Sequence, residues 1–153
     1  IQRAVNATAA GVLVTQDIWG QQPASYTINA KWGLGMRVVE GQKIPEQIIF
    51  DTRNKGTRIL SRSDEDTMLV FDALGGIKQV NVPPAKSILN EPRAEALGDI
   101  ATQLIPVFSV GGVDCTRSVT PLVVECGQPL DIEWVLEGDA FWVVQVRPYV
   151  QHR

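Results

Sequence analysis

The chain has 153 residues, of which 14 are basic and 17 acidic, so its formal charge is −3 and its pI lies near 5.1. This negative balance argues against a basic surface for nucleic acid or for an anionic membrane. The composition, 44% apolar and 20% charged, is typical of a globular chain of one domain. The longest apolar runs, such as residues 140–144, are far shorter than the roughly 20 residues that span a bilayer.

Cysteine and histidine content limits the metal chemistry of the chain. Cys115 and Cys126 are too few for a four-ligand zinc site, and the single histidine, His152, stands near the end of the sequence. Two reduced thiols in a cytoplasmic protein are the simplest interpretation, and one disulfide is the alternative. The sequence begins with isoleucine and shows no signal peptide, so we expect a piece of a longer protein.

Short strands dominate the predicted structure before residue 83. The clearest is 25–32, where Tyr26, Ile28, Ala30 and Trp32 alternate with Thr27, Asn29 and Lys31. One helical turn is predicted at 36–40, and turns at 54–56 and 75–76. The predicted strands in this part lie at residues 2–5, 10–15, 25–32, 47–52, 57–61, 67–72 and 77–82.

One substantial helix follows. Asn90 is the predicted N-cap, Pro92 lies in the first turn, and the helix extends to Phe108, with Gly98 weakening it and Pro106 kinking its last turn. A helical spacing of three and four residues predicts one buried face. That face comprises Leu97, Ile100, Ala101, Leu104, Ile105 and Phe108. Residues 109–128 are ambiguous, with a short strand near 122–124, and strands at 131–136 and 141–149 close an α+β fold with a mostly antiparallel sheet.

The last two strands carry the side chains of most chemical interest. Alternation places Asp131 and Glu133 on one face of their strand and Ile132 on the other. On the next strand, one face holds Phe141, Val143, Gln145 and Arg147. A three-residue loop at 138–140 pairs Glu133 with Gln145 and Asp131 with Arg147, whereas a two-residue loop sets Gln145 opposite Ile132. We predict the three-residue loop.

In that register two carboxylates, an amide and a guanidinium share one surface. Carboxylate and amide oxygens suit Mg²⁺, which completes its shell with water and substrate phosphates. A guanidinium beside them can hold a phosphate oxygen and stabilise the charge that moves during transfer. The alternative is an exposed hairpin face with a single cross-strand ion pair.

These residues also carry a resemblance. Asp131-Ile132-Glu133-Trp134 followed by Gln145-Val146-Arg147-Pro148 resembles the end of the nucleotide-binding domain in the phosphoenolpyruvate synthase and pyruvate phosphate dikinase family, an ending that rifampicin phosphotransferase shares. Residues 2–17 (QRAVNATAAGVLVTQD) resemble the family's "Q-x-M-V … A-G-V-L-F-T-x-D-P" segment. Residues 28–35 (INAKWGLG) resemble "I-N-A-x-x-G-L-G-E", and 39–46 resemble "V-x-G … P-D".

The resemblance implies the C-terminal half of an ATP-grasp domain. Glu133 and Gln145 would then bind Mg²⁺ on ATP, Arg147 would contact the phosphates as the catalytic residue, and Asp131 would support them. Nucleotide contacts are also implied for Thr15, Asp17, Gly33 and Gly35. The partners would be the N-terminal ATP-grasp half and a swivelling phosphohistidine domain of the parent chain, so residues 1–153 alone would not turn over ATP.

Some positions depart from the family pattern. Met36 stands where the family has the glutamate of "G-L-G-E", and 109–128 reads as an insertion before Pro129. The resemblance favours a phosphotransferase that moves a phosphoryl group from Mg-ATP to a histidine. A degenerate, non-catalytic module with a structural or regulatory role is the alternative, and the final acceptor is open.

Overall fold

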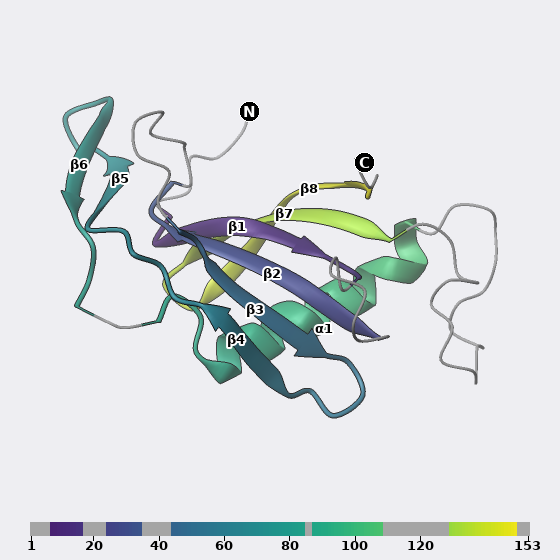
Figure 1. The fold of residues 1–153 in the computed structure, drawn as a ribbon. Helices are drawn as coiled ribbons and strands as arrows, with labels where there is room; N and C mark the ends of the chain where they lie inside the picture. Colours follow the sequence, from purple (N-terminus) through teal and green to yellow (C-terminus); the bar gives the residue numbers. More distant parts are fainter. Residues whose placement is uncertain (1–6, 17–23, 35–43, 85–86, 109–128, 150–153) are drawn as a thin grey trace.

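Six strands form one antiparallel sheet in the order β4-β3-β2-β1-β7-β8 (Figure 1). The computed structural model describes residues 7–16, 24–34, 44–84, 87–108 and 129–149, and the statements below concern these residues. The strands of this sheet are β1 (Ala9–Val14), β2 (Ser25–Trp32), β3 (Glu46–Asp51), β4 (Thr57–Ser61), β7 (Leu130–Glu137) and β8 (Ala140–Pro148). A separate two-stranded sheet pairs β5 (Thr67–Phe71) with β6 (Ile77–Asn81), and the one described helix is α1 (Glu91–Phe108).

The predicted α+β class is confirmed, because every described strand pair is antiparallel and one helix accompanies them. Each described strand lies within one residue of its predicted bounds at both ends. The predicted strands at 2–5 and 122–124, the helical turn at 36–40 and the insertion at 109–128 lie outside the described residues.

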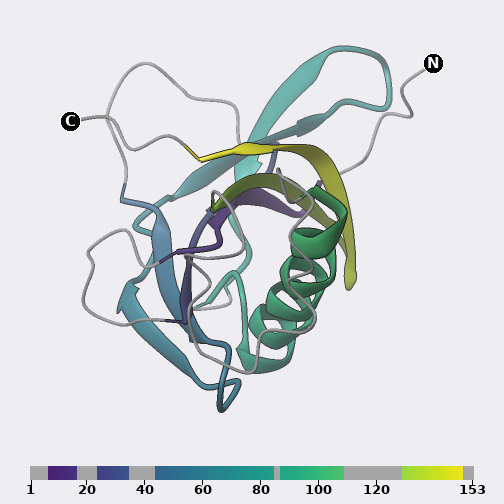
Figure 2. The ribbon, with the colours of Figure 1, turned by 90° about the vertical axis from the view of Figure 1, so that its right-hand side faces the viewer.

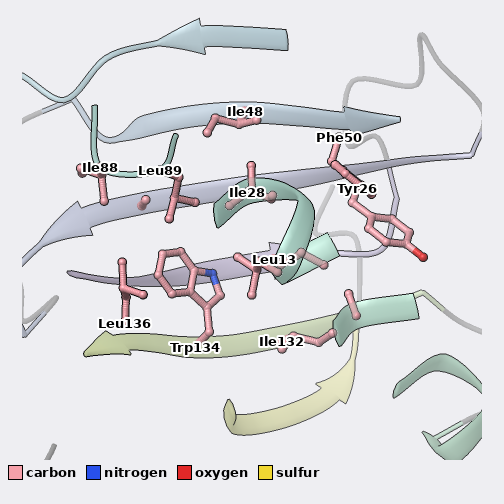
Figure 3. Close-up of a cluster of buried hydrophobic side chains, with 14 of the residues drawn as sticks. Leu13, Tyr26, Ile28, Ile48, Phe50, Ile88, Leu89, Ile132, Trp134 and Leu136 are labelled. Carbon is pink, nitrogen blue, oxygen red and sulfur yellow. The ribbon is translucent and has the colours of Figure 1, made fainter. Parts of the chain in front are cut away.

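The helix α1 lies across one face of the large sheet (Figure 2), which we call the covered face. Side chains from four neighbouring strands point toward it and form the core (Figure 3). Trp134, Leu13, Ile28, Ile48 and Phe50 are at most 1% exposed there. Cross-strand pairs such as Leu13 with Ile28 and Ile132 place these residues on the same face, as the alternation of β2 predicts.

The buried stripe of α1 differs from the predicted one. Asn90 caps the helix as predicted, since its Oδ1 accepts a hydrogen bond from Arg93 N at 2.9 Å. The predicted face was wrong at its far end, where Phe108 is 43% exposed. The buried residues are Ala94, Leu97, Gly98 and Ala101. Gly98 lies against Phe50, and a Cβ added there would be 2.4 Å from the Phe50 ring, so the helix approaches the sheet through its glycine.

A buried carboxylate ties the sheet to the start of this helix. Glu46 of β3 is 0% exposed on the covered face. Its two oxygens accept hydrogen bonds from Ile88 N at 2.9 Å and Leu89 N at 2.8 Å, just before the N-cap, and Arg62 lies 3.4 Å from it. A buried charge of this kind is tolerated because both oxygens are hydrogen-bonded.

Candidate functional site

The β7–β8 hairpin places the predicted polar residues opposite one another. Asp131 pairs with Arg147 and Glu133 with Gln145, which confirms the predicted register. The predicted three-residue loop was wrong, because Glu137 pairs with Ala140 across a two-residue turn whose Gly138 has a φ of 61°. Glycine at the first central position suits such a hairpin turn.

A β-bulge reconciles the short turn with the polar register. The pairing shifts between Glu133 and Trp134, so that Val144 is the extra residue on β8. Without the bulge Gln145 would lie opposite Ile132. The bulge also corrects the predicted face of β8, because Phe141 and Val143 pair with Leu136 and Trp134 on the covered face, away from Gln145.

Two of the four hairpin residues have no partner among the residues that the structure describes. Glu133 and Gln145 are exposed, and no other described residue makes a hydrogen bond or ion pair with their side chains. Asp131 accepts a hydrogen bond from Arg147 Nε at 3.1 Å, with 17% of the Asp131 side chain and 62% of the Arg147 side chain exposed. This single bond leaves both terminal amines of Arg147 without an acceptor among the described residues.

These four side chains lie on the face of the sheet opposite α1, which we call the open face. Glu133 pairs with Val12 of β1, and Val12 pairs in turn with Asn29 of β2. Cross-strand partners point the same way, so Asn29 and Glu133 share this face. In the sequence Asn29 appeared as a polar residue of an alternating strand and as part of the segment that resembles "I-N-A-x-x-G-L-G-E", and neither pattern indicated that its Oδ1 is buried without a hydrogen bond among the described residues.

Thr15 lies at the end of β1 that is next to the Asp131–Arg147 pair. It is 4% exposed, its amide donates to Leu130 O at 2.9 Å, and its Oγ1 accepts from Leu130 N at 2.8 Å. Thr15 therefore joins β1 to β7 and holds the hairpin in place. Asp17, predicted to lie beside it, falls outside the described residues.

Gly33 lies at the other end of the sheet. It follows Trp32, which pairs with Ala9, whereas Asp131 pairs with Val14, roughly 17 Å away along β1. The Gly33 amide donates to Thr8 O at 2.8 Å, and a Cβ at Gly33 would be 2.5 Å from Leu69 O of β5. The structure thus does not bring Gly33 to the hairpin residues, and its nucleotide contact stays a prediction. Gly35 and Met36 lie outside the described residues.

Hard oxygen ligands and a guanidinium define what this surface can do. The Glu133 carboxylate and the Gln145 amide oxygen supply two facing donors that fit Mg²⁺, an ion that usually keeps several waters and binds substrate phosphates. Among the described residues no group of three or more histidine, cysteine or acidic side chains is placed to hold a metal ion.

Comparison with known proteins decides the family. Residues 1–153 match the family described as pyruvate phosphate dikinase, AMP/ATP-binding domain. The chain belongs to this family. The resemblance inferred from the sequence is therefore confirmed, and this AMP/ATP-binding domain is where the hairpin residues lie.

Curated relatives of this AMP/ATP-binding domain are much longer proteins with different names. A probable phosphoenolpyruvate synthase of Methanocaldococcus jannaschii is 28% identical, over 97% of this chain and 11% of the relative. The prodigiosin synthesizing transferase PigC of Serratia marcescens and the rifampicin phosphotransferase of Bacillus subtilis are each 27% identical, over 97% of this chain and 15% of the relative. The chain thus spans less than a fifth of the relatives it matches. Among its described residues, no helix is both long and apolar enough to cross a membrane.

Proposed function

We propose that this AMP/ATP-binding domain is the C-terminal half of an ATP-grasp domain in a cytoplasmic phosphotransferase. The observation that carries the proposal is the register of β7 and β8, which sets Glu133 and Gln145, both without a partner in the described part of the chain, opposite each other beside the Asp131–Arg147 pair. Membership in an AMP/ATP-binding family supports ATP as the ligand of this surface.

Each hairpin residue has a role in the proposed site. Glu133 and Gln145 would hold Mg²⁺, which when bound neutralises phosphate charge, as phosphoryl transfer requires. Arg147, oriented by Asp131, places its terminal amines on the phosphates and stabilises the charge that develops during transfer. Thr15 fixes the hairpin through Leu130, and Asp17, Gly33 and Gly35 would contact the nucleotide farther along.

The remaining catalytic parts would come from the parent chain. We propose that an N-terminal ATP-grasp half supplies donors to the opposite side of the nucleotide, and that a histidine on a swivelling domain accepts the phosphoryl group. Residues 1–153 alone would then bind Mg-ATP no tighter than the millimolar range, roughly −4 kcal/mol. The names of the relatives include a synthase, a synthesizing transferase and a drug phosphotransferase, which is consistent with an acceptor chosen elsewhere in the parent chain.

Replacing Arg147 in the intact protein tests the proposal. Arg147→Ala should slow single-turnover phosphorylation of the histidine, followed with labelled ATP at saturating nucleotide, by about 10²–10³, the loss expected for one preorganised donor. Arg147→Lys should restore little of this rate, because an ammonium lacks the planar fork of the guanidinium. If Arg147 only completes an ion pair with Asp131, the rate stays unchanged and stability falls by about 1 kcal/mol or less.

A degenerate, non-catalytic module is the second candidate, favoured by Met36 in place of the family's glutamate. The same measurement separates the two functions. An intact protein that binds no Mg-ATP and phosphorylates no histidine would support the structural or regulatory role. A measurable transfer rate that depends on Arg147 would remove it.

A further inference from the structure

Two side chains on the open face of β2, Asn29 and Ser25, have a buried oxygen without a hydrogen-bond partner among the described residues, and Asn29 is the one in line with Glu133 across β1. Its Oδ1 is buried and has no hydrogen bond, although nearly all buried polar atoms in proteins have one. Gln47, its neighbour on β3, differs, because the Gln47 Oε1 accepts a hydrogen bond from Ser61 Oγ at 3.3 Å. Leaving a buried acceptor unpaired is costly, so an unpaired one calls for an explanation.

The position of Asn29 connects it to the proposed site. Asn29, Val12 and Glu133 are successive cross-strand neighbours on β2, β1 and β7. Two strand spacings separate the backbones of Asn29 and Glu133, roughly 10 Å. Val12 between them is an apolar, half-buried side chain and competes for no hydrogen bond. A hydrated ion or a polyphosphate held by Glu133 and Gln145 has the size to reach across Val12 to Asn29.

The charge next to Asn29 favours the same kind of ligand. Lys31 is two residues along β2 on the same face, next to Ala10, and no described residue forms an ion pair with it. A half-buried cation without an ion-pair partner in the described part of the chain raises the local preference for an anion such as a polyphosphate. The open face of β2 therefore offers an acceptor and a cation to whatever binds at the hairpin.

We propose that Asn29 is a binding residue of this site, whose Oδ1 accepts a hydrogen bond carried by bound Mg-ATP. The donor is either a water on the ion, since Mg²⁺ usually keeps several waters, or an N–H or O–H of the nucleoside. The proposal rests on the function proposed above. It explains why β2 has an amide at this place although the described residues give its oxygen no partner.

Removing the amide should separate binding from stability. In the intact protein Asn29→Leu, of similar size and without polar atoms, should weaken calorimetric binding of Mg²⁺ with the β,γ-imido analogue of ATP by tenfold or more. Without nucleotide the melting temperature should stay unchanged or rise, because an unpaired buried acceptor is gone. Should the leucine variant fail to fold, Asn29→Val provides the same comparison with a strand-forming side chain.

A matched control and a smaller ligand sharpen the test. Gln47→Leu makes the same change one strand away and should leave the affinity unchanged while lowering the melting temperature, since it breaks the bond with Ser61. Mg-tripolyphosphate, which has no nucleoside, identifies the donor: a weakened affinity for it in Asn29→Leu indicates a metal-bound water, and a loss seen only with the ATP analogue indicates the nucleoside.

Two results would count against the proposals in different ways. If the unaltered protein binds the analogue and Asn29→Leu binds it within twofold as tightly, the inference on Asn29 is overturned and the function proposed above stands. If the unaltered intact protein binds no Mg-nucleotide, both fall together.

Discussion

The two faces of the six-stranded sheet differ in whether their polar side chains have hydrogen-bond partners among the described residues. On the covered face apolar side chains pack against α1, and the buried Glu46 has both oxygens hydrogen-bonded. On the open face Glu133, Gln145 and Asn29 carry polar atoms for which the described chain supplies no partner. The same strands supply both faces, since residues alternate between them.

This contrast indicates which side chains serve stability and which are available for a ligand. A polar group that is buried and fully hydrogen-bonded supports the fold, and its loss leaves other groups unpaired. Exposed polar groups without partners in the protein contribute little to stability. They can exchange water for a ligand without a loss of stability in the folded chain. Charge alone does not separate the two classes, because Glu46 and Glu133 are the same residue type on opposite faces of one sheet.

The largest effect on stability is expected at Glu46. Glu46→Ala should lower the free energy of unfolding by about 3–5 kcal/mol, because it leaves the buried amides of Ile88 and Leu89 unpaired and removes the partner of Arg62. Glu133→Ala should change the free energy of unfolding by about 0.5 kcal/mol or less. Urea unfolding of the intact protein measures both.

Glu46→Gln is the control for shape. It keeps the volume and one acceptor oxygen, so its loss of stability should be smaller than that of Glu46→Ala. Equal losses for Glu46→Ala and Glu133→Ala would contradict the division between the two faces.

A smaller effect is expected at Gly98, on the helix that makes the covered face. Helix propensity alone predicts that Gly98→Ala stabilises the protein by about 1 kcal/mol. The structure predicts the opposite sign, a loss of about 1–3 kcal/mol, since the new Cβ would be 2.4 Å from the buried ring of Phe50. Thermal or urea unfolding decides the sign.

A double mutant shows whether the ring is the cause. Phe50→Leu shrinks the side chain that meets Gly98, so alanine at 98 should cost less in this background than in the unaltered protein. A stabilising Gly98→Ala would mean that α1 does not pack closely against Phe50 at this position.

Periodicity predicted elements well and contacts between elements poorly. The alternation of Ser25–Trp32 identified the covered face of β2, because a strand with one buried face must alternate. The helical spacing could not locate the end of the buried stripe, since that depends on which residues of the sheet lie beneath the helix, and Phe108 is 43% exposed. Gly98 read as a weak point for the same reason, because its partner Phe50 is distant in sequence.

The hairpin register was predictable, whereas the way it is achieved was not. For Glu133 to lie opposite Gln145, the hairpin needs one residue more than a two-residue turn provides. The sequence offered no reason to place this residue at Val144 rather than in the turn. The end-to-end separation of Gly33 and Asp131 follows only from the antiparallel pairing of β1 with both neighbours. Roles drawn from motif order along the chain do not by themselves show which motifs meet in space.

The smallest effect is a pH dependence at Asp51, at the end of β3 where the open face meets the β3–β4 turn. Its carboxylate accepts a hydrogen bond from Arg53 N at 2.8 Å, and this bond, with smaller help from the Arg53 side chain, lowers the pKa of Asp51 below its ordinary value of 3.8. A lowered pKa means that the charged form is favoured in the folded state. The stabilisation is therefore complete above about pH 4 and is lost as the pH falls through the folded-state pKa.

Asp51→Asn removes this charge and keeps an oxygen that can accept from Arg53 N. The variant should be less stable than the unaltered protein at pH 7 by less than about 1 kcal/mol, the size expected for an exposed pair. The difference should shrink as the pH falls below about 3.8, because the unaltered carboxyl then loses its charge as well. Urea unfolding curves of both proteins at pH 7 and at a pH below 3.8 measure this difference in stability. A difference that grows in acid would show that the charge of Asp51 opposes folding. Unlike Glu133 on the same face, Asp51 already has its partner inside the chain, so its titration should report on the fold and stay unchanged when Mg-ATP is added.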